Sequence, residues 1–281
     1  MPIDAWLKSS VQQLTEAGID SARLDCLLLL EDATGKDRGW LLAHSEFELS
    51  DEQLETLGKQ LNRRARHIPL AYIRGRVEFY GRSFAVNKHV LVPRPESEAM
   101  IGLLKDLAVN GDASKADKKA GLTIIDVGTG SGALAVTAKL EVPAAAVIGT
   151  DIDPACLEVA RRNAAALHVD CSFMEADLLS PDVIASAGNN FIILANLPYV
   201  PDGYPINRAA THEPKLALFA GIDGLDLYKQ LWQQIAGAAT KPQAVITEAL
   251  EDQHHALATI ARHYGYLQTA KEGLAQAFTP L

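Results

Sequence analysis

The spacing of apolar residues changes along the chain and divides it into two parts. In residues 1–75 apolar side chains recur at three-, four- and seven-residue intervals, as at Leu7 and Leu14, which is the pattern of amphipathic helices. Ser50 with Gln53 three positions later matches a capping box and predicts the start of another helix. We therefore expect residues 1–75 to form a helical bundle, with a role in substrate recognition assigned only by exclusion.

Residues 76–92 show a different pattern, in which short runs of apolar and β-branched residues flank Gly81 and Arg82. This predicts a β-hairpin that links two domains, with its turn at Gly81-Arg82. The prolines that follow delay the next helix until Pro95, which suits a first helical turn. That helix is expected to end near Leu107, followed by an exposed loop over 109–121.

From residue 122 onward, apolar runs typical of buried strands alternate with amphipathic segments. This alternation predicts a parallel, doubly wound α/β sheet in a domain spanning residues 93–281. The expected strands are 122–127, 146–151, 170–174, 190–196, 243–249 and 265–270. The expected helices are 131–141, 153–167, 224–238 and 251–263.

The amino-acid composition limits the classes of protein to which the chain can belong. The chain has 281 residues, of which 48% are hydrophobic and 22% charged, as in ordinary globular proteins. It has no apolar run of the roughly 18 residues that a membrane span needs and no basic segment before an apolar one at its start. We therefore expect a cytoplasmic protein without membrane contact. Its three scattered cysteines form no pair typical of a metal site, so no metal is expected.

Charge argues against a dedicated nucleic-acid binder, because the net charge is −9 and such binding depends on neutralising phosphates. Locally, however, basic residues dominate the segment 57–82. This segment is either a solvated helix face or a docking patch for an acidic or RNA-associated partner. Its basic residues are Lys59, Arg63, Arg64, Arg66, Arg74, Arg76 and Arg82.

A glycine-rich turn follows the first expected strand of the sheet. Glycines let the backbone turn tightly and approach a ligand, and the following helix offers free N–H groups there. The pattern indicates a nucleotide-type cofactor, although it also satisfies the dinucleotide-binding pattern, and a tight turn without ligand is the plainer alternative. The turn comprises Gly128, Thr129, Gly130, Ser131 and Gly132.

Two further strand ends carry acidic residues. Asp151 ends the second strand, where a carboxylate can accept hydrogen bonds from both hydroxyls of a ribose. Asp177 follows the third strand, where it could bind an adenine amino group while Leu178 packs on the ring. An ordinary turn aspartate explains Asp177 equally well.

The fourth strand ends in the most informative stretch, Asn196, Leu197, Pro198 and Tyr199. An asparagine side chain both donates and accepts hydrogen bonds but cannot act as a base or nucleophile. We expect the Asn196 side-chain oxygen and the Leu197 carbonyl to hold a planar nitrogen for methyl transfer. Pro198 forces Leu197 into extended geometry, and Tyr199 offers a ring face to the planar group.

With these residues in view, the chain resembles the PrmC/HemK family, the glutamine methyltransferases of peptide chain release factors. The resemblance extends from the N-terminal helices to about residue 250. Besides the glycine turn, Asp151 and Asn196–Tyr199, it rests on the segments 69–75, 78–81, 92–96, 213–218 and 224–228.

The resemblance implies a Rossmann-like class I methyltransferase domain that uses S-adenosylmethionine and releases S-adenosylhomocysteine. It implies methylation of the glutamine in the Gly-Gly-Gln motif of release factors, with residues 128–132, Asp151, Leu178 and Asn196 at the cofactor. The helical domain would then contact the release factor. The sequence departs from the family at Leu197, where proline is usual, at Leu178, where an aromatic is common, and after about residue 264.

Three alternatives remain open at this stage. An adenine-N6 methyltransferase acting on nucleic acid would use the same Asn-Leu-Pro-Tyr stretch. An NAD-dependent oxidoreductase would share the glycine turn and Asp151, but no residues for a hydride partner are evident. A non-catalytic, cofactor-binding scaffold for release factor would explain the departures at Leu178 and Leu197.

Overall fold

The structure is a computed structural model that describes residues 1–110 and 121–281, and the expected loop at 109–121 falls largely outside these ranges. The chain divides into two compact units. Unit 1 comprises Met1–Arg76 with Ile206–His212, and unit 2 comprises Val77–Pro205 with Glu213–Leu281. The short segment 206–212, which follows the Asn196–Tyr199 stretch, therefore belongs to the helical unit.

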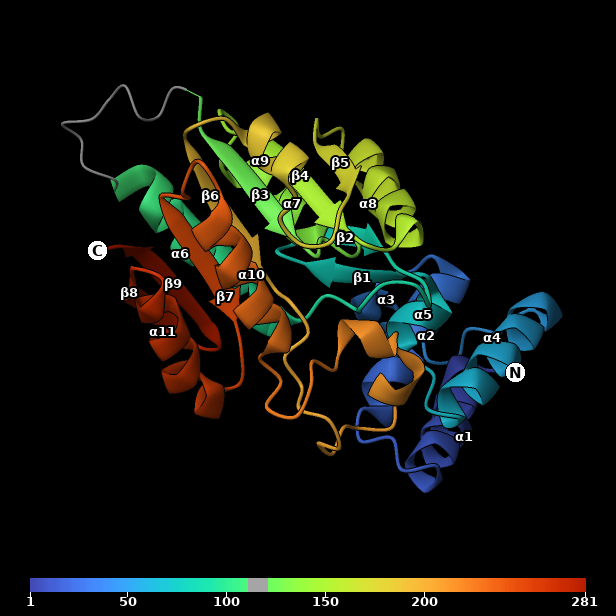
Figure 1. The fold of residues 1–281 in the computed structure, drawn as a ribbon. Helices are drawn as coiled ribbons and strands as arrows, with labels where there is room; N and C mark the ends of the chain where they lie inside the picture. The colour runs from blue at the N-terminus through green and yellow to red at the C-terminus, as the bar shows by residue number, and fades with distance from the viewer. Residues whose placement is uncertain (111–120) are drawn as a thin grey trace. The chain divides into compact units, whose positions relative to one another are not determined.

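Unit 1 is helical, as its apolar spacing predicts (Figure 1). Its helices surround a core that includes the fully buried Leu14, Leu29 and Leu57. The capping box is present, because the Ser50 side chain accepts from the Gln53 N–H and the Gln53 side chain accepts from the Ser50 N–H. The helices are α1 (Ile3–Glu16), α2 (Ala22–Thr34), α3 (Arg38–Ala43), α4 (Asp51–Ala65) and α5 (Leu70–Arg74).

Five of the seven basic residues between residues 57 and 82 form ion pairs within the protein. Arg64 is buried and bonds to Asp25 at 2.6 Å, and both Arg74 and Arg76 pair with Asp32. Lys59 and Arg82 also have carboxylate partners. These ion pairs reduce the charge that the five residues offer to a partner, and the choice between a solvated face and a docking patch stays a prediction.

The predicted hairpin is formed by β1 (Arg76–Phe79) and β2 (Arg82–Ala85), and all of it except Arg76 belongs to unit 2. Its turn lies one residue earlier than expected, at Tyr80 and Gly81, whose φ angles are 51° and 70°. Two successive residues with positive φ match the twist of a two-residue hairpin turn. The helix after the hairpin, α6 (Glu98–Asn110), follows a short 3-10 turn, η1 (Pro95–Ser97).

The main sheet of unit 2 has seven strands in the order β5-β4-β3-β6-β7-β9-β8. All pairings from β5 to β7 are parallel, as expected. The sequence did not predict β9, which lies between β7 and β8 and pairs antiparallel with both, so this edge of the sheet departs from the parallel arrangement. The strands are β3 (Thr123–Val127), β4 (Ala146–Asp151), β5 (Ser172–Glu175), β6 (Phe191–Ala195), β7 (Ala244–Glu248), β8 (Tyr266–Glu272) and β9 (Ala275–Pro280).

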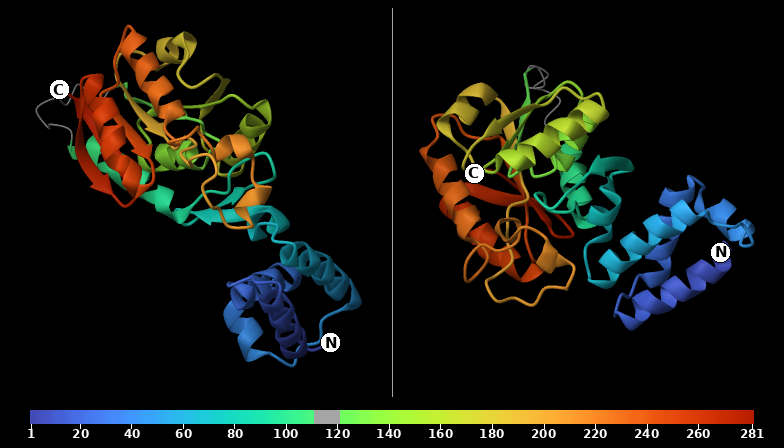
Figure 2. Two further views of the ribbon diagram at one scale, coloured as in Figure 1. Left: turned by 60° about the horizontal axis from the view of Figure 1, so that its bottom comes forward. Right: turned by 90° about the vertical axis from the view of Figure 1, so that its right-hand side faces the viewer.

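Helices cover both faces of this sheet (Figures 1 and 2). Successive residues of β3 alternate between the two layers, because Ile124 packs with one core cluster and Ile125 with the other. Burial on both faces is typical of parallel sheets. One layer contains α6, α7 (Ala133–Glu141) and α8 (Pro154–Ala166), and the other contains α9 (Pro181–Ala187), α10 (Asp226–Gly237) and α11 (His254–His263). Within residues 1–110 and 121–281, no helix is long and apolar enough to cross a membrane.

Candidate active site

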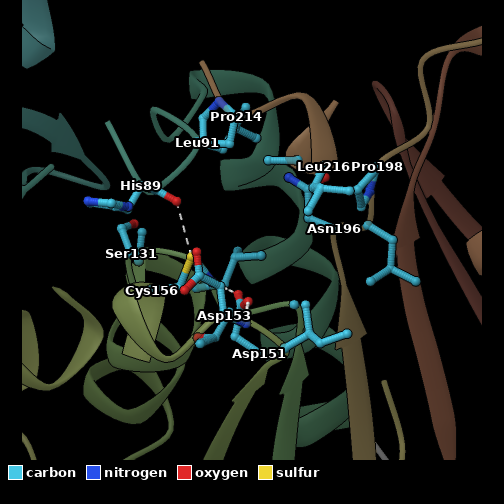
Figure 3. Close-up of a pocket in the computed structure, with 18 of the residues that line it drawn as sticks. His89, Leu91, Ser131, Asp151, Asp153, Cys156, Asn196, Pro198, Pro214 and Leu216 are labelled. Carbon is cyan, nitrogen blue, oxygen red and sulfur yellow. Dashed lines mark hydrogen bonds between the residues drawn. The ribbon is translucent and has the colours of Figure 1, made fainter. Parts of the chain in front are cut away.

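A pocket of about 470 Å³ opens at the carboxyl ends of β3, β4, β5 and β6 (Figure 3). The strand order reverses between β3 and β6, and ligands of open α/β sheets bind at such a switch point. Ten of the twelve predicted site residues line the pocket, and Gly132 and Tyr199 do not. Those that line it are Gly128, Thr129, Gly130, Ser131, Asp151, Asp177, Leu178, Asn196, Leu197 and Pro198.

The glycine turn forms the floor between β3 and α7. Gly128, Gly130 and Gly132 have φ angles of 73°, 52° and 78°, a region that favours glycine. A Cβ on Gly130 would meet nothing within 4 Å, whereas one on Gly132 would lie 2.9 Å from the Cβ of Ala160. Gly132 therefore lets α7 and α8 pack closely, and its assignment to the cofactor stays a prediction, while Gly130 keeps backbone open to the pocket.

Asp151 is fixed beside this turn. One carboxylate oxygen accepts from the Gly130 N–H at 2.9 Å and the other from the Asp153 N–H at 3.0 Å. Burial raises the pKa of Asp151, and these two hydrogen bonds oppose that rise. Each carboxylate oxygen retains a lone pair, so the residue can accept two hydroxyls of a diol.

Asp177 and Leu178 lie beyond β5 with different exposure. Leu178 is buried, has a φ of 57° and lines the pocket. Asp177 is exposed at the pocket, and its carboxylate accepts from the Gln230 side chain at 3.3 Å. Leu178 thus offers an apolar surface for a ring, while Asp177 is partly engaged elsewhere.

Asn196 follows the last residue of β6, and its side chain is held from one side. Its Nδ2 donates to the Ser97 hydroxyl at 2.8 Å, while the Leu197 N–H donates to the buried Tyr228 hydroxyl at 3.3 Å. Within the described ranges, no donor reaches the Asn196 side-chain oxygen or the Leu197 carbonyl. In Figure 3, Asn196 and Asp151 come from different walls of the same pocket. Two acceptors are therefore available for a donor in the pocket.

Tyr199 does not take the position expected of it. Its hydroxyl donates to Oε1 of Glu248 at 2.9 Å, and its ring packs against the core beneath α10. Burial is the main cause of a raised pKa at Tyr199. In this structure the Glu248 carboxylate, 49 residues away in the sequence, holds the Tyr199 side chain outside the pocket lining. A contact between the Tyr199 ring and a planar substrate group stays a prediction.

Sequence reasoning missed several polar residues that support the site. Ser97 lines the pocket, and the buried Glu248 ends β7 next to β6. Glu213 is also buried, accepting from the Val92 N–H at 3.0 Å and pairing with Arg94. The signal for Glu248 was present, since it is a polar residue at a strand end, like Asp151 and Asn196.

The chain is similar to proteins of known function along most of its length. The PrmC N-terminal domain model matches residues 5–75, and the model for ribosomal protein L11 methyltransferase (PrmA) matches residues 110–197. The release factor glutamine methyltransferase of Deinococcus radiodurans is 34% identical over 250 residues, covering 88% of this chain and 86% of that protein. The chain belongs to the release factor glutamine methyltransferase family. Another member of this family, from Bacillus subtilis, is 36% identical, with 82% of this chain and 78% of that protein covered.

Other similar proteins are either longer than this chain or share its fold at low sequence identity. A bifunctional methyltransferase of Rickettsia felis is 32% identical, and the chain spans 53% of its length. The human METTL16 catalytic domain, solved with an RNA hairpin, has a TM-score of 0.53 at 13% identity, with 82% of each chain covered. The N-terminal domain of human METTL16, solved with SAH, has a TM-score of 0.51 at 14% identity, with 85% and 86% covered. These likenesses show that this member of the release factor glutamine methyltransferase family has a class I methyltransferase fold.

Proposed function

We propose that this protein transfers a methyl group from S-adenosylmethionine to the side-chain amide nitrogen of the glutamine in the Gly-Gly-Gln motif of a peptide chain release factor. The observation that carries the proposal concerns Asn196. It lines the same pocket as the glycine turn and Asp151, and among the described residues no donor reaches its side-chain oxygen. Membership of the family names the substrate class. The cytoplasmic location stays a prediction.

The residues of the pocket fit the cofactor. Asp151 suits the ribose diol, Leu178 the adenine face, and the open backbone at Gly130 the polar end of the molecule. S-adenosylmethionine supplies an electrophilic methyl group on a sulfonium sulfur. No metal is needed for this transfer.

The acceptors at the end of β6 explain how an amide could react. An amide nitrogen is a poor nucleophile because its lone pair is delocalised. The Asn196 side-chain oxygen and the Leu197 carbonyl can each accept one N–H of the glutamine amide, which orients the nitrogen and stabilises positive charge as it develops. The new N–C bond forms as the S–C bond breaks, and the surplus proton leaves the nitrogen for water.

A role for the helical unit in recognising the release factor is part of the proposal. It is supported by the match of residues 5–75 to the PrmC N-terminal domain. Arg63, in the last turn of α4, and Arg66, which caps that helix, are both exposed. Exchanging both for alanine should raise KM for release factor and leave the affinity for S-adenosylmethionine unchanged.

The test is mass spectrometry of a release factor after incubation with the protein and S-adenosylmethionine. We expect one added methyl group, located on the glutamine of the Gly-Gly-Gln motif. A parallel incubation with ribosomal RNA and labelled cofactor tests the adenine alternative, and calorimetry with NAD tests the oxidoreductase alternative. Label found only in RNA, or binding of NAD without binding of S-adenosylmethionine, would overturn the proposal.

A further inference from the structure

Glu248 is a buried carboxylate at the carboxyl end of β7, beside the end of β6. Ala195 pairs with Thr247, so the next residues along the two strands, Asn196 and Glu248, are neighbours. The Glu248 residue is 1% exposed. Burying a carboxylate is costly unless it is well hydrogen-bonded, and the strand would be buried equally well with an apolar side chain. A carboxylate at this position therefore indicates a role other than burial of the strand.

Hydrogen-bond donors from Tyr199, Ser97 and Asn196 lie near the Glu248 carboxylate. Oε1 accepts from the Tyr199 hydroxyl at 2.9 Å. The Ser97 hydroxyl and the Asn196 side chain lie close enough that both, like Tyr199, lower the pKa of Glu248, although burial dominates and raises it. Glu96 is the acidic neighbour that adds to the rise. The second oxygen, Oε2, is buried and has no hydrogen bond of regular geometry within the described residues, so it can still accept one.

The Ser97 hydroxyl determines which groups of this cluster donate hydrogen bonds and which accept them. Its oxygen accepts from Asn196 Nδ2 at 2.8 Å, which leaves its own proton to be donated. An ionised carboxylate only accepts hydrogen bonds, and Glu248 Oε2, which has no hydrogen-bond partner among the described residues, is available to accept that proton. A chain of donors from Asn196 through Ser97 to Glu248 needs only this second hydrogen bond in addition to the one between Asn196 and Ser97.

We propose that Glu248, acting through Ser97, is the positioning residue that orients the Asn196 carboxamide. With an acceptor at Glu248, the amino group of Asn196 faces the protein and its oxygen faces the pocket. The reverse orientation would present an N–H donor to the glutamine amide, whose nitrogen must itself donate. The inference rests on the proposed function, since it explains how that amide is held.

The exchange Glu248→Gln tests this directly, because glutamine has nearly the same shape but a donor group. With Tyr199 still donating to the oxygen, the introduced amino group donates toward Ser97, whose proton then turns to Asn196 and reverses the carboxamide. We expect kcat for release factor methylation to fall at least about tenfold. The affinity for S-adenosylmethionine should change less than about twofold, and the melting temperature should not fall, because a buried charge is removed.

A compensating variant separates orientation from general damage. In Asn196→Asp both side-chain atoms are oxygens, so orientation no longer matters, but two carboxylates then compete for the Ser97 proton. Combining Asn196→Asp with Glu248→Gln restores one donor chain in the opposite direction and keeps an oxygen facing the pocket. We expect the double variant to be more active than either single variant, because the two changes are coupled.

The control is Glu141→Gln, which removes a carboxylate that pairs with Arg82 and Lys105 and does not line the pocket. Its kcat should equal that of the unmodified protein. Normal kcat in Glu248→Gln, or a double variant no better than the worse single one, would overturn the inference.

A second measurement does not depend on the substrate. In the unmodified protein the Asn196 side-chain protons should exchange slowly with solvent by NMR, and in Glu248→Gln they should exchange faster. If the unmodified protein methylates no release factor, the proposed function fails. The exchange rates then still decide the orientation, and equal rates in both proteins would refute it.

Discussion

The Asp151 carboxylate accepts a hydrogen bond of 2.9 Å from the Gly130 backbone N–H. This bond joins the two sequence features that indicate a nucleotide cofactor, the glycine turn after β3 and the acidic end of β4. It also fixes the carboxylate before a ligand arrives. Such preorganisation lowers the cost of binding, because the side chain need not be ordered by the ligand.

Replacement of Asp151 should therefore weaken cofactor binding. We expect Asp151→Ala to raise Kd for S-adenosylmethionine at least about tenfold, since hydrogen bonds to a charged group contribute about 1.5–3 kcal/mol. Asp151→Asn should have an intermediate effect because one acceptor oxygen remains. The measurement is titration calorimetry.

Asp177→Asn is the matched comparison. Its Kd for S-adenosylmethionine should stay within about threefold of the unmodified protein's, since this carboxylate is exposed and contacts Gln230. Equal effects at both positions would contradict the assignment of the ribose to Asp151.

Asn196 should matter for transfer more than for cofactor binding. Asn196→Ala removes the side-chain acceptor, and loss of one such electrostatic contact costs about 10²–10³ in kcat. The affinity for S-adenosylmethionine should remain within about tenfold. Single-turnover methylation of release factor, with calorimetry on the same sample, measures both. An active Asn196→Ala protein would remove this residue from the mechanism.

Leu197 should affect stability more than activity. Its side chain is 2% exposed, and its Cδ2 lies 3.1 Å from the position that a Cβ on Gly128 would occupy. Leu197→Ala should lower the free energy of unfolding by about 2–5 kcal/mol through cavity formation. The backbone carbonyl remains, so kcat should stay within about tenfold. Leu197→Met preserves volume and should cost less than about 1.5 kcal/mol. A large loss of kcat with unchanged stability would show that the side chain itself contributes to transfer.

The sequence predicts the parts of the fold that are encoded locally. β3 and β6 are short runs of apolar residues with abrupt polar ends, and the pocket lies where those ends meet. β9 was missed because its short Ala275–Phe278 pattern becomes a strand only by pairing with β7 and β8. Propensity is weak in such cases and tertiary pairing decides.

Site residues that end a strand can be identified from the local sequence, whereas those held by distant residues cannot. Asp151 and Asn196 are identifiable because each ends its own strand. The position of Tyr199 depends on Glu248, which is 49 residues away in the sequence, and the hold on Asn196 depends on Ser97, which is 99 residues away. No local pattern specifies such contacts, so the supporting residues emerge only when the strands are brought together.

The buried carboxyl group of Asp126 should make the free energy of unfolding depend on pH. This carboxylate is buried in β3, where one oxygen accepts from Thr129 and from the Ala135 N–H and the other has no hydrogen-bond partner within the described residues. Burial is the main cause that raises the pKa of Asp126 from 3.8 to about 6, and Asp151 adds to the rise. The folded protein therefore binds this proton more tightly than the unfolded chain does.

The stabilisation from that proton is complete below about pH 4, the pKa of the unfolded chain, and is lost as pH rises through about 6. Asp126→Asn has no proton to lose. Between pH 4 and pH 7, the free energy of unfolding of the unmodified protein should therefore fall by about 2 kcal/mol relative to that of Asp126→Asn. Urea unfolding at several pH values measures this difference. The groups with raised pKa elsewhere, including Glu248, are common to both proteins and cancel. A difference that stays constant with pH would show that Asp126 titrates alike in the folded and unfolded states.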